Sequence, residues 1–281
     1  MEKELREKAR GLLQSGEVKV LIGYGVGSVP FKSTPIFART AEDAERLVWN
    51  PTCVNNLAVY LPSAVKQGRV AVVVKPCDAG SVVELIKEHQ IKREDVMTIV
   101  VPCPGVTNGG TDESLAAKCL SCDLGDPVIA DVKIGDQPAR NPAPSTAVQE
   151  YEKLSPAERR AFWAAQFEKC IRCYACREAC PGCYCRECFA EKPGQLWVLR
   201  STDPTSNWMF HMTRAMHLAG RCIACRECER ACPMDIPLSL LGTIIEADVA
   251  EMFSYEPGSD PEALPVFGQF DLAKDPDPCP E

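Results

Sequence analysis

The sequence lacks several features that would indicate other classes of protein. No apolar run reaches the roughly 18 residues that a membrane-spanning helix needs. The net charge of −8 is opposite in sign to that of a nucleic-acid-binding surface. The chain has only 3 histidines, and it shows no Ser-His-Asp triad, P-loop or pair of catalytic carboxylates. We therefore expect no membrane span, no nucleic-acid partner and no catalytic residues.

The chain also shows no secretion signal. Residues 1–16, MEKELREKARGLLQSG, form a charged amphipathic pattern without the apolar stretch of a signal peptide. A signal for export would place cysteines in an oxidising compartment, where they form disulfides. We therefore expect a cytoplasmic protein of anaerobic metabolism, whose thiolates stay reduced.

Cysteine is what the sequence has in excess, with 17 in 281 residues. Residues 170–181 read CIRCYACREACP, and residues 222–233 read CIACRECERACP. Both have the spacing C-x2-C-x2-C-x3-C-P of bacterial ferredoxins with two 4Fe-4S clusters, in which the fourth cysteine of each run binds the other cluster. The predicted ligand sets are cluster 1 (Cys170, Cys173, Cys176 and Cys232) and cluster 2 (Cys222, Cys225, Cys228 and Cys180).

These cysteines could instead bind zinc or form disulfides. Zinc sites usually draw their four ligands from two pairs, such as C-x2-C followed by a second C-x2-C. Two complete runs that each end in Cys-Pro favour clusters, and a zinc-stapled scaffold without redox function is the alternative. A disulfide framework would be typical of a short secreted chain, which this is not.

The first part of the chain has the pattern of an α/β domain with parallel strands. We expect a helix over residues 3–15 and a strand over 18–22. The continuous β-branched run at 69–74 predicts a buried strand, followed by a helix at 81–89 and a strand at 97–101. Strand, helix and strand in this order form a right-handed βαβ unit.

Four further segments carry weaker signals. Residues 23–28, GYGVGS, are expected to form a turn rather than a dinucleotide-binding loop, since their glycines have the wrong spacing. Residues 41–50 are expected to be helical, and the alternation over 128–134 predicts an edge strand. Residues 141–147, NPAPSTA, have the composition of a linker.

These patterns divide the chain into three parts. We expect an α/β domain over residues 1–140, an α+β dicluster ferredoxin-like domain over 148–255, and an extended proline-rich tail over 256–281. The second domain includes predicted helices at 155–169 and 237–253, the first with Ser155 as its N-cap.

The first domain has cysteines of its own. A C-x2-C pair, with single cysteines upstream near the ends of strands, predicts a third 4Fe-4S cluster. Buried free thiols are the alternative. The pair is Cys119 and Cys122, and spacing alone leaves the choice among Cys53, Cys77 and Cys103 open.

Cys183, Cys185 and Cys188 follow the first run directly. They could hold a further cluster or a zinc ion, or remain unligated. His211 and His217 are expected to pack near the clusters or to hydrogen-bond their sulfurs rather than to bind metal.

Arg214 and Arg221 lie near the second run in sequence. Positive charge at these positions could raise cluster potentials. Ordinary salt bridges at the surface are the alternative.

Residues 69–105 and 118–136, with NPTCVNNLAVYL upstream, resemble the beta subunits of deazaflavin-dependent hydrogenases and formate dehydrogenases. The resemblance covers roughly residues 18–136. The later stretch, from Cys170 to Leu238, looks like the ferredoxin modules of formate-dehydrogenase-type beta subunits and of proteins associated with heterodisulfide reductases.

The resemblance implies a ligand set for the third cluster, namely Cys53, Cys103, Cys119 and Cys122, with Cys77 unligated. It also implies 4Fe-4S clusters and often FAD, which passes electrons to the deazaflavin. Two departures weigh against FAD and deazaflavin activity. The ferredoxin module here follows the family domain, and the chain lacks the long C-terminal portion that completes the flavin pocket.

The sequence thus predicts a non-catalytic electron-transfer subunit that relays single electrons through three or more 4Fe-4S clusters. The expected partners are a heterodisulfide-reductase-like flavoprotein and a hydrogenase or formate dehydrogenase. The alternative is a flavin-containing subunit that itself reduces a deazaflavin or nicotinamide, with a pocket built from residues 23–28 and 75–80.

Overall fold

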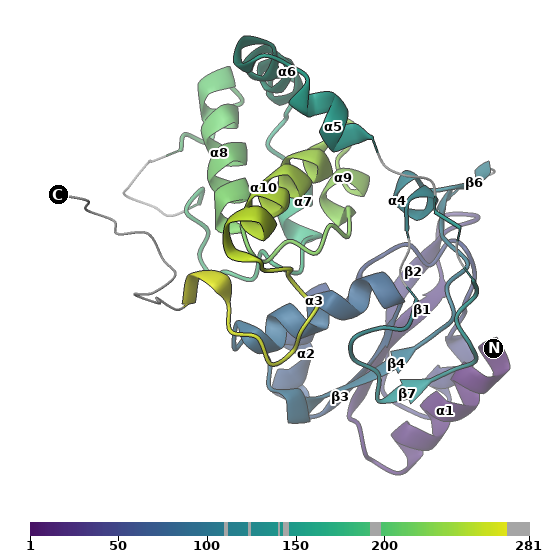
Figure 1. Ribbon diagram of the computed structural model, residues 1–281. Helices are drawn as coiled ribbons and strands as arrows, with labels where there is room; N and C mark the ends of the chain where they lie inside the picture. The colour runs from purple at the N-terminus through teal and green to yellow at the C-terminus, as the bar shows by residue number, and fades with distance from the viewer. Residues whose placement is uncertain (110–111, 123–124, 140, 143–145, 192–197, 269–281) are drawn as a thin grey trace.

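The computed structural model describes residues 1–109, 112–122, 125–139, 141–142, 146–191 and 198–268 (Figure 1). An α/β domain comes first, and a module of helices lies against it, with α3 between the module and the sheet. Among the described residues, no helix is long and apolar enough to cross a membrane.

A mixed five-stranded sheet with the order β2-β1-β3-β4-β7 forms the centre of the first domain. Strands β1, β3, β4 and β7 are parallel, and β2 runs antiparallel to β1 at the edge. Every residue of β3 and β4 is buried, as continuous apolar strands covered on both faces should be. The strands are β1 (Val20–Val26), β2 (Ser33–Ala38), β3 (Val70–Val74), β4 (Val96–Val100) and β7 (Val132–Lys133).

The predicted βαβ unit is confirmed. Strands β3 and β4 pair in parallel, with Val70 opposite Val96, and α3 (Pro76–Lys87) connects them. The helix begins earlier than expected because Lys75 takes an extended N-cap conformation and Pro76 occupies the first turn, where its missing N–H costs nothing. The residues directly after β3 therefore belong to a helix N-terminus.

The first helix is confirmed as α1 (Glu2–Gln14), which buries Leu5, Ala9 and Leu12. The remaining elements of this domain are short: η1 (Asp43–Arg46), η2 (Leu57–Tyr60), α2 (Leu61–Ala64), η3 (Val65–Gln67), η4 (Arg93–Asp95), β5 (Thr107–Gly109), β6 (Asp112–Leu115) and α4 (Ala117–Leu120).

Three expectations for this domain were wrong. Residues 23–26 continue β1 instead of turning, because β2 pairs with them. A Cβ at Gly23 would lie 2.4 Å from a Leu47 methyl carbon, so this glycine permits close packing. The helix expected at 41–50 is a single 3-10 turn, η1, and the edge strand expected at 128–134 shrinks to β7.

Helices are the only regular elements in the described residues of the second part of the chain. Its elements are α5 (Ala147–Glu152), α6 (Pro156–Glu168), α7 (Ala175–Glu178), α8 (Pro204–His217), α9 (Glu227–Arg230) and α10 (Leu238–Phe253). Trp163, Phe167 and Phe210 pack at its centre. Ser155 caps α6 as expected, with a reciprocal hydrogen bond to Glu158.

An α+β arrangement was expected here, but no strand occurs in the described residues from Thr146 onward. The reason is the segment between the two cysteine runs, which forms α8. Asp203 caps this helix by accepting a hydrogen bond from the Ser206 N–H, and Pro204 occupies its first turn.

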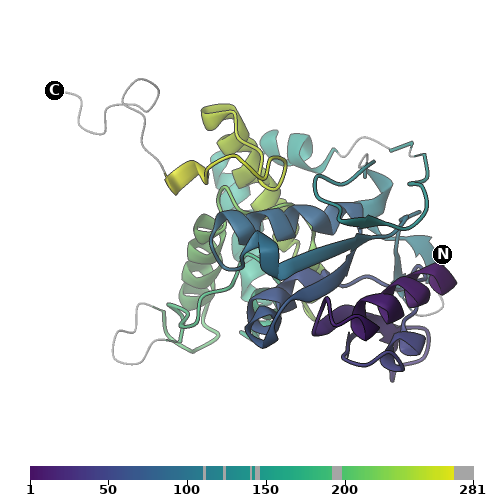
Figure 2. The same cartoon turned by 90° about the horizontal axis from the view of Figure 1, so that it is seen from below.

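The chain after α10 returns to the first domain (Figure 2). The Gly258 N–H donates to the Glu84 carboxylate on α3 at 2.7 Å, and Lys87 Nζ donates to the Tyr255 hydroxyl at 2.5 Å. The segment ends in η5 (Val266–Gly268). The sequence predicts an extended tail from residue 256, but the segment that ends at residue 268 folds back against α3. Residues 269–281, with Cys279, lie outside the described residues.

Candidate iron–sulfur centres

The two cysteine runs wrap in the same way. Arg172 and Tyr174 in the first run have positive φ angles of 55° and 59°, and Ala224 and Arg226 in the second have 52° and 60°. Left-handed conformations at two such positions bend the backbone sharply and are uncommon for residues other than glycine. Both runs thus form tight loops, and each loop leads into a one-turn helix within the run, α7 in the first and α9 in the second.

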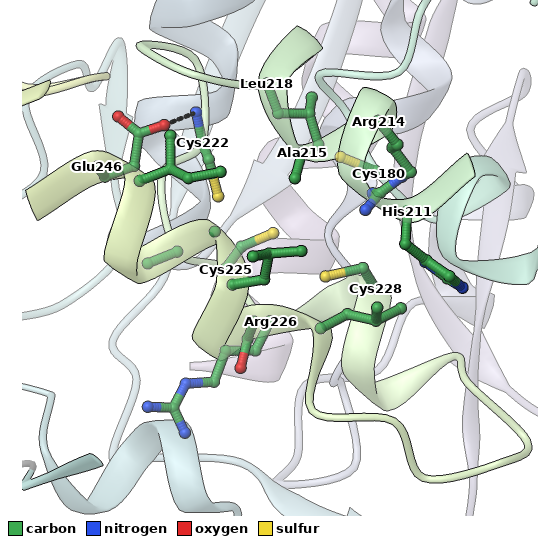
Figure 3. A pocket seen from close by; sticks show the side chains of 16 residues that line it. Cys180, His211, Arg214, Ala215, Leu218, Cys222, Cys225, Arg226, Cys228 and Glu246 are labelled. Carbon is green, nitrogen blue, oxygen red and sulfur yellow. Dashed lines mark hydrogen bonds between the residues drawn. The ribbon is translucent and has the colours of Figure 1, made fainter. Parts of the chain in front are cut away.

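Cys180, Cys222, Cys225 and Cys228 line one cavity, which α8 and α10 close (Figure 3). The structure therefore brings together all four residues of the predicted cluster 2 set. A Cβ at Gly242 on α10 would lie 3.1 Å from Cys222 Sγ. A glycine at this position leaves room beside the thiol, so the residues present fit a bulky inorganic group.

The cluster 1 set also comes together. Burial raises the pKa of Cys176 to about 11, Arg214 opposes this, and Cys170, Cys232 and Cys173 each lie near enough to raise it further. Cys173 is exposed. The cluster 1 set thus lies closer to the surface than the cluster 2 set.

The thiols of cluster 2 favour the protonated form when no iron is bound. Burial raises the pKa of Cys222 and of Cys228 to about 12, and raises that of Cys225 further. Iron binds thiolates, so cluster assembly must displace these protons and supply the compensating charge.

A second cavity, of about 230 Å³, lies at the carboxyl ends of β3 and β4. Ligands gather at this edge of a parallel sheet. Cys77 follows β3, Cys103 follows β4, and Cys119 and Cys122 come from α4 and the residues after it. We call this the N-terminal cavity.

Cys53 does not lie at the N-terminal cavity. It is fully buried in the core, with its Sγ 3.6 Å from Ser33 Oγ and 3.8 Å from the Val48 carbonyl. The ligand set implied by the family resemblance, which includes Cys53 and leaves Cys77 out, is thus not the set that the structure gathers. In the sequence, the position of Cys77 shortly after a predicted buried strand was the feature that could have indicated its place at this cavity.

A buried charge network beside this cavity has no signal in the sequence. Lys75 Nζ lies 2.7 Å from Asp78 Oδ2 and donates to the Tyr24 hydroxyl at 2.7 Å. Burial alone would lower the pKa of Lys75, but Asp78 and Tyr24 hold it well above its usual value. The lysine therefore stays charged and is neutralised by the protein itself.

The N-terminal cavity adjoins cluster 2. Cys225 lines both cavities. Lys118 Nζ donates to the Cys225 carbonyl at 3.1 Å and lies 3.7 Å from Glu227 on α9. The cavity is thus a contact between the two parts of the molecule as well as a pocket of the first.

Cys183, Cys185 and Cys188 line an open pocket at the surface, together with Cys180. A hydrogen bond with Cys180 lowers the pKa of Cys183, burial opposes it, and Arg214 acts with the hydrogen bond. Cys185 is exposed. The three surplus cysteines are thus gathered in one place.

The four polar residues singled out from the sequence divide into two pairs. His211 and Arg214 are buried and line the cluster 2 cavity. His217 packs edge-on against Phe189, and Arg221 forms an ion pair with Glu88 at 2.8 Å. The first pair is placed to act on a cluster.

The zinc alternative requires ligands that converge on one point. Within the described ranges, no group of three or more His, Cys, Asp or Glu side chains is placed to hold a metal ion. Each thiolate of a 4Fe-4S cluster binds a different iron, so cluster ligands stand farther apart than the ligands of one ion.

Comparison with known proteins first defines the class of the module. Residues 169–237 match the model of a 4Fe-4S dicluster domain. The chain is therefore an iron–sulfur protein with a dicluster module, to which the matched residues contribute both cysteine runs.

Two relatives show more specifically which proteins the chain resembles. The chain is 36% identical over 105 residues to the F420-dependent formate dehydrogenase subunit beta of Methanocaldococcus jannaschii, a match that covers 37% of this chain and 27% of the relative. It is 23% identical over 353 aligned positions to the F420-dependent formate dehydrogenase 1 subunit beta of Methanococcus maripaludis, covering 92% of this chain and 90% of the relative. The chain thus resembles beta subunits of this kind, joined to a dicluster domain.

A solved structure also matches part of the chain. It is the F420-reducing [NiFe] hydrogenase complex of Methanosarcina barkeri in a xenon-derivatised form. The match has 22% identity and a TM-score of 0.29, and covers 36% of this chain and 40% of that one. A TM-score of this size supports no argument about structure.

Proposed function

We propose that this protein is a non-catalytic electron-transfer subunit of a multi-subunit oxidoreductase, which relays single electrons through three 4Fe-4S clusters. The observation that carries the proposal is the shared position of Cys225, which lines both the cluster 2 cavity and the N-terminal cavity. A cluster in each cavity would leave little protein between them, as electron transfer requires.

The ligands of the relay are assigned as follows. Clusters 1 and 2 take the exchanged sets, in which Cys180 and Cys232 cross over. The N-terminal cluster takes the four cysteines of its cavity, Cys77, Cys103, Cys119 and Cys122, in place of a set that includes Cys53. When bound, the clusters supply one-electron redox chemistry.

Two observations support an order for the proposed relay. Cluster 2 lies next to the N-terminal cavity, and cluster 1 has an exposed ligand in Cys173. Electrons therefore pass between the N-terminal cluster and cluster 1 by way of cluster 2, and a partner subunit docks near Cys173. We also propose that the chain is divided into residues 1–140, 148–255 and 256–281.

The partners follow from the relatives, which are named as subunits of F420-dependent formate dehydrogenases. The matched region spans 27% of the first relative's length. These names support a formate dehydrogenase or hydrogenase as one redox partner. As the other partner we propose a heterodisulfide-reductase-like flavoprotein, on the resemblance of the dicluster module alone.

Iron and sulfide quantification on anaerobically purified protein, with EPR of the reduced form, tests the proposal. Three 4Fe-4S clusters require about twelve irons per chain, two require about eight, and four about sixteen. Eight would remove the N-terminal cluster, and sixteen would assign a further cluster to Cys183, Cys185 and Cys188. Zinc without iron would overturn the proposal. Bound FAD that is bleached when reduced deazaflavin or reduced nicotinamide is added would favour the flavin enzyme.

A further inference from the structure

Arg214 reaches both ligand sets of the dicluster module. It lies on α8 with 7% of its surface exposed, and it lines the cluster 2 cavity beside Cys180 (Figure 3). Its Nη2 donates to the Cys176 carbonyl, in the cluster 1 loop, at 2.9 Å. The guanidinium therefore lies between the two predicted clusters.

This guanidinium has no carboxylate partner. Among the residues that the structure describes, no Asp or Glu oxygen lies within 4.0 Å of it, and its Nε makes no hydrogen bond. Burying an unpaired charge is expensive, so an opposite charge must be close in the working protein. The groups that act most strongly on Arg214 are cysteines, first Cys180 and then Cys183, Cys228 and Cys176.

An arginine side chain keeps its positive charge even when it is buried, so the surroundings of Arg214 must balance that charge. Thiolates bound to an iron–sulfur cluster, and the cluster itself, carry the negative charge that a buried guanidinium needs. The clusters thus take the place of the missing carboxylate.

His211 supplies a second polar group without a partner. It lines the same cavity, is 2% exposed, and stacks on Phe167, while neither of its ring nitrogens has a hydrogen-bond partner. Burial together with Arg214 lowers its pKa to about 3, so the ring is neutral and keeps one N–H donor. Hydrogen bonds to cluster sulfurs raise reduction potentials.

A fixed positive charge makes reduction easier, since the reduced cluster carries one more negative charge and the low dielectric of the interior screens it weakly. We propose that Arg214 tunes the clusters: its guanidinium raises the reduction potentials of both cluster 1 and cluster 2, so that they accept electrons from the N-terminal cluster. This inference rests on the proposed function, because it needs both clusters to be present.

The test compares Arg214→Met with Arg214→Lys, which keeps the charge, and with Arg160→Met, which removes an exposed arginine of α6. Each variant is reduced stepwise under anaerobic conditions, and the cluster signals are followed by EPR. For Arg214→Met we expect both midpoint potentials to fall by the equivalent of at least a tenfold change in the equilibrium constant, about 59 mV for one electron. Arg214→Lys should lie between it and the unmodified protein, and Arg160→Met should not shift.

An Arg214→Met protein with its full iron content and potentials equal to those of Arg160→Met would overturn the inference. That result would leave the proposed function intact, whereas an unmodified protein without the irons of clusters 1 and 2 would sink the proposed function first. If Arg214→Met loses iron, its potentials no longer test the inference, and the position of Arg214 is tested on the unmodified protein instead. With arginine labelled by ¹⁵N, HYSCORE spectra of the reduced clusters should show coupling to nitrogen of the guanidinium, and its absence would contradict the placement.

Discussion

The two parts of the molecule neutralise their buried cations in different ways. Beside the N-terminal cavity, Lys75 is paired with Asp78 and Lys118 with Glu227. In the dicluster module, Arg214 has no carboxylate within 4.0 Å among the described residues, and it donates to the Cys176 carbonyl beside several cysteines. The first arrangement is complete in the protein alone, whereas the second needs the negative charge of a cluster.

The same contrast appears in the cores. The sheet is held by the fully buried strands β3 and β4, which need no cofactor to pack. The module packs a few aromatic side chains around loops whose cysteines include Cys176. Since a small core supplies little stability, such modules depend on metal. The first domain should therefore fold without iron, and the module should not.

Iron removal should have the largest effect on this comparison. After chelation under reducing conditions, we expect the amides of β3 and β4 to stay protected from hydrogen exchange, while those of residues 222–232 lose protection. Helical circular dichroism should fall accordingly, since the module is helical. Equal protection of the two parts after complete iron loss would contradict the contrast.

Replacing single cysteines tests which residues hold the N-terminal cluster. Cys77→Ser should lower the iron content by about four per chain, because the cluster loses one of its four ligands. Cys53→Ala, a change at a buried cysteine outside the cavity, is the matched control and should keep all the iron. The opposite pattern would restore the ligand set implied by the family resemblance.

Lys75→Met tests whether the first domain depends on its internal ion pair. Removing the ammonium leaves Asp78 buried without its partner, which should cost about 3–5 kcal/mol of unfolding free energy. Lys3→Met is the control, since the side chain of Lys3 is 90% exposed and its ion pair with Glu7 contributes little.

The unfolding free energy of both lysine variants is measured by chemical denaturation, monitored by fluorescence. A double variant, Lys75→Met with Asp78→Leu, should recover part of the loss because no buried charge is left unpaired. If Lys75→Met were as stable as Lys3→Met, the buried pair would have no structural role.

Asp131 gives the smallest expected effect, and one that depends on pH. Burial opposes its ionisation, but a hydrogen bond from Arg93 and two from Thr98 outweigh it and lower its pKa below the ordinary 3.8. Its stabilising contribution is therefore complete above that value and is lost as the pH falls through the lower, folded-state pKa. Asp131→Asn should cost about 1 kcal/mol at pH 7.

The check for Asp131 is the difference in unfolding free energy between the variant and the unmodified protein, measured from pH 7 downward. The difference should narrow below the ordinary pKa of 3.8. A difference that stays constant with pH would mean that the carboxylate charge plays no part.

Much of the architecture follows from local sequence. The run at 69–74, the helix after it and the run at 97–101 predicted the parallel unit correctly, because unbroken β-branched runs are typical of strands covered on both faces. The antiparallel strand β2 was missed, since Ser33–Ala38 lacks an alternating pattern and acquires its pairing only from β1. The glycines at 23 and 25 were misread for the same reason.

The candidate sites divide in the same way between local and long-range information. Spacing by itself predicted the two exchanged cysteine sets, since three thiolates at i, i+3 and i+6 can curl round one cluster in a tight loop while the fourth must come from elsewhere. Tertiary structure alone decided that Cys77, and not Cys53, reaches the N-terminal cavity, and that Arg214, and not Arg221, reaches both cysteine runs. Local sequence cannot distinguish Cys77 from Cys53, or Arg214 from Arg221, because their surroundings depend on which distant elements pack against them.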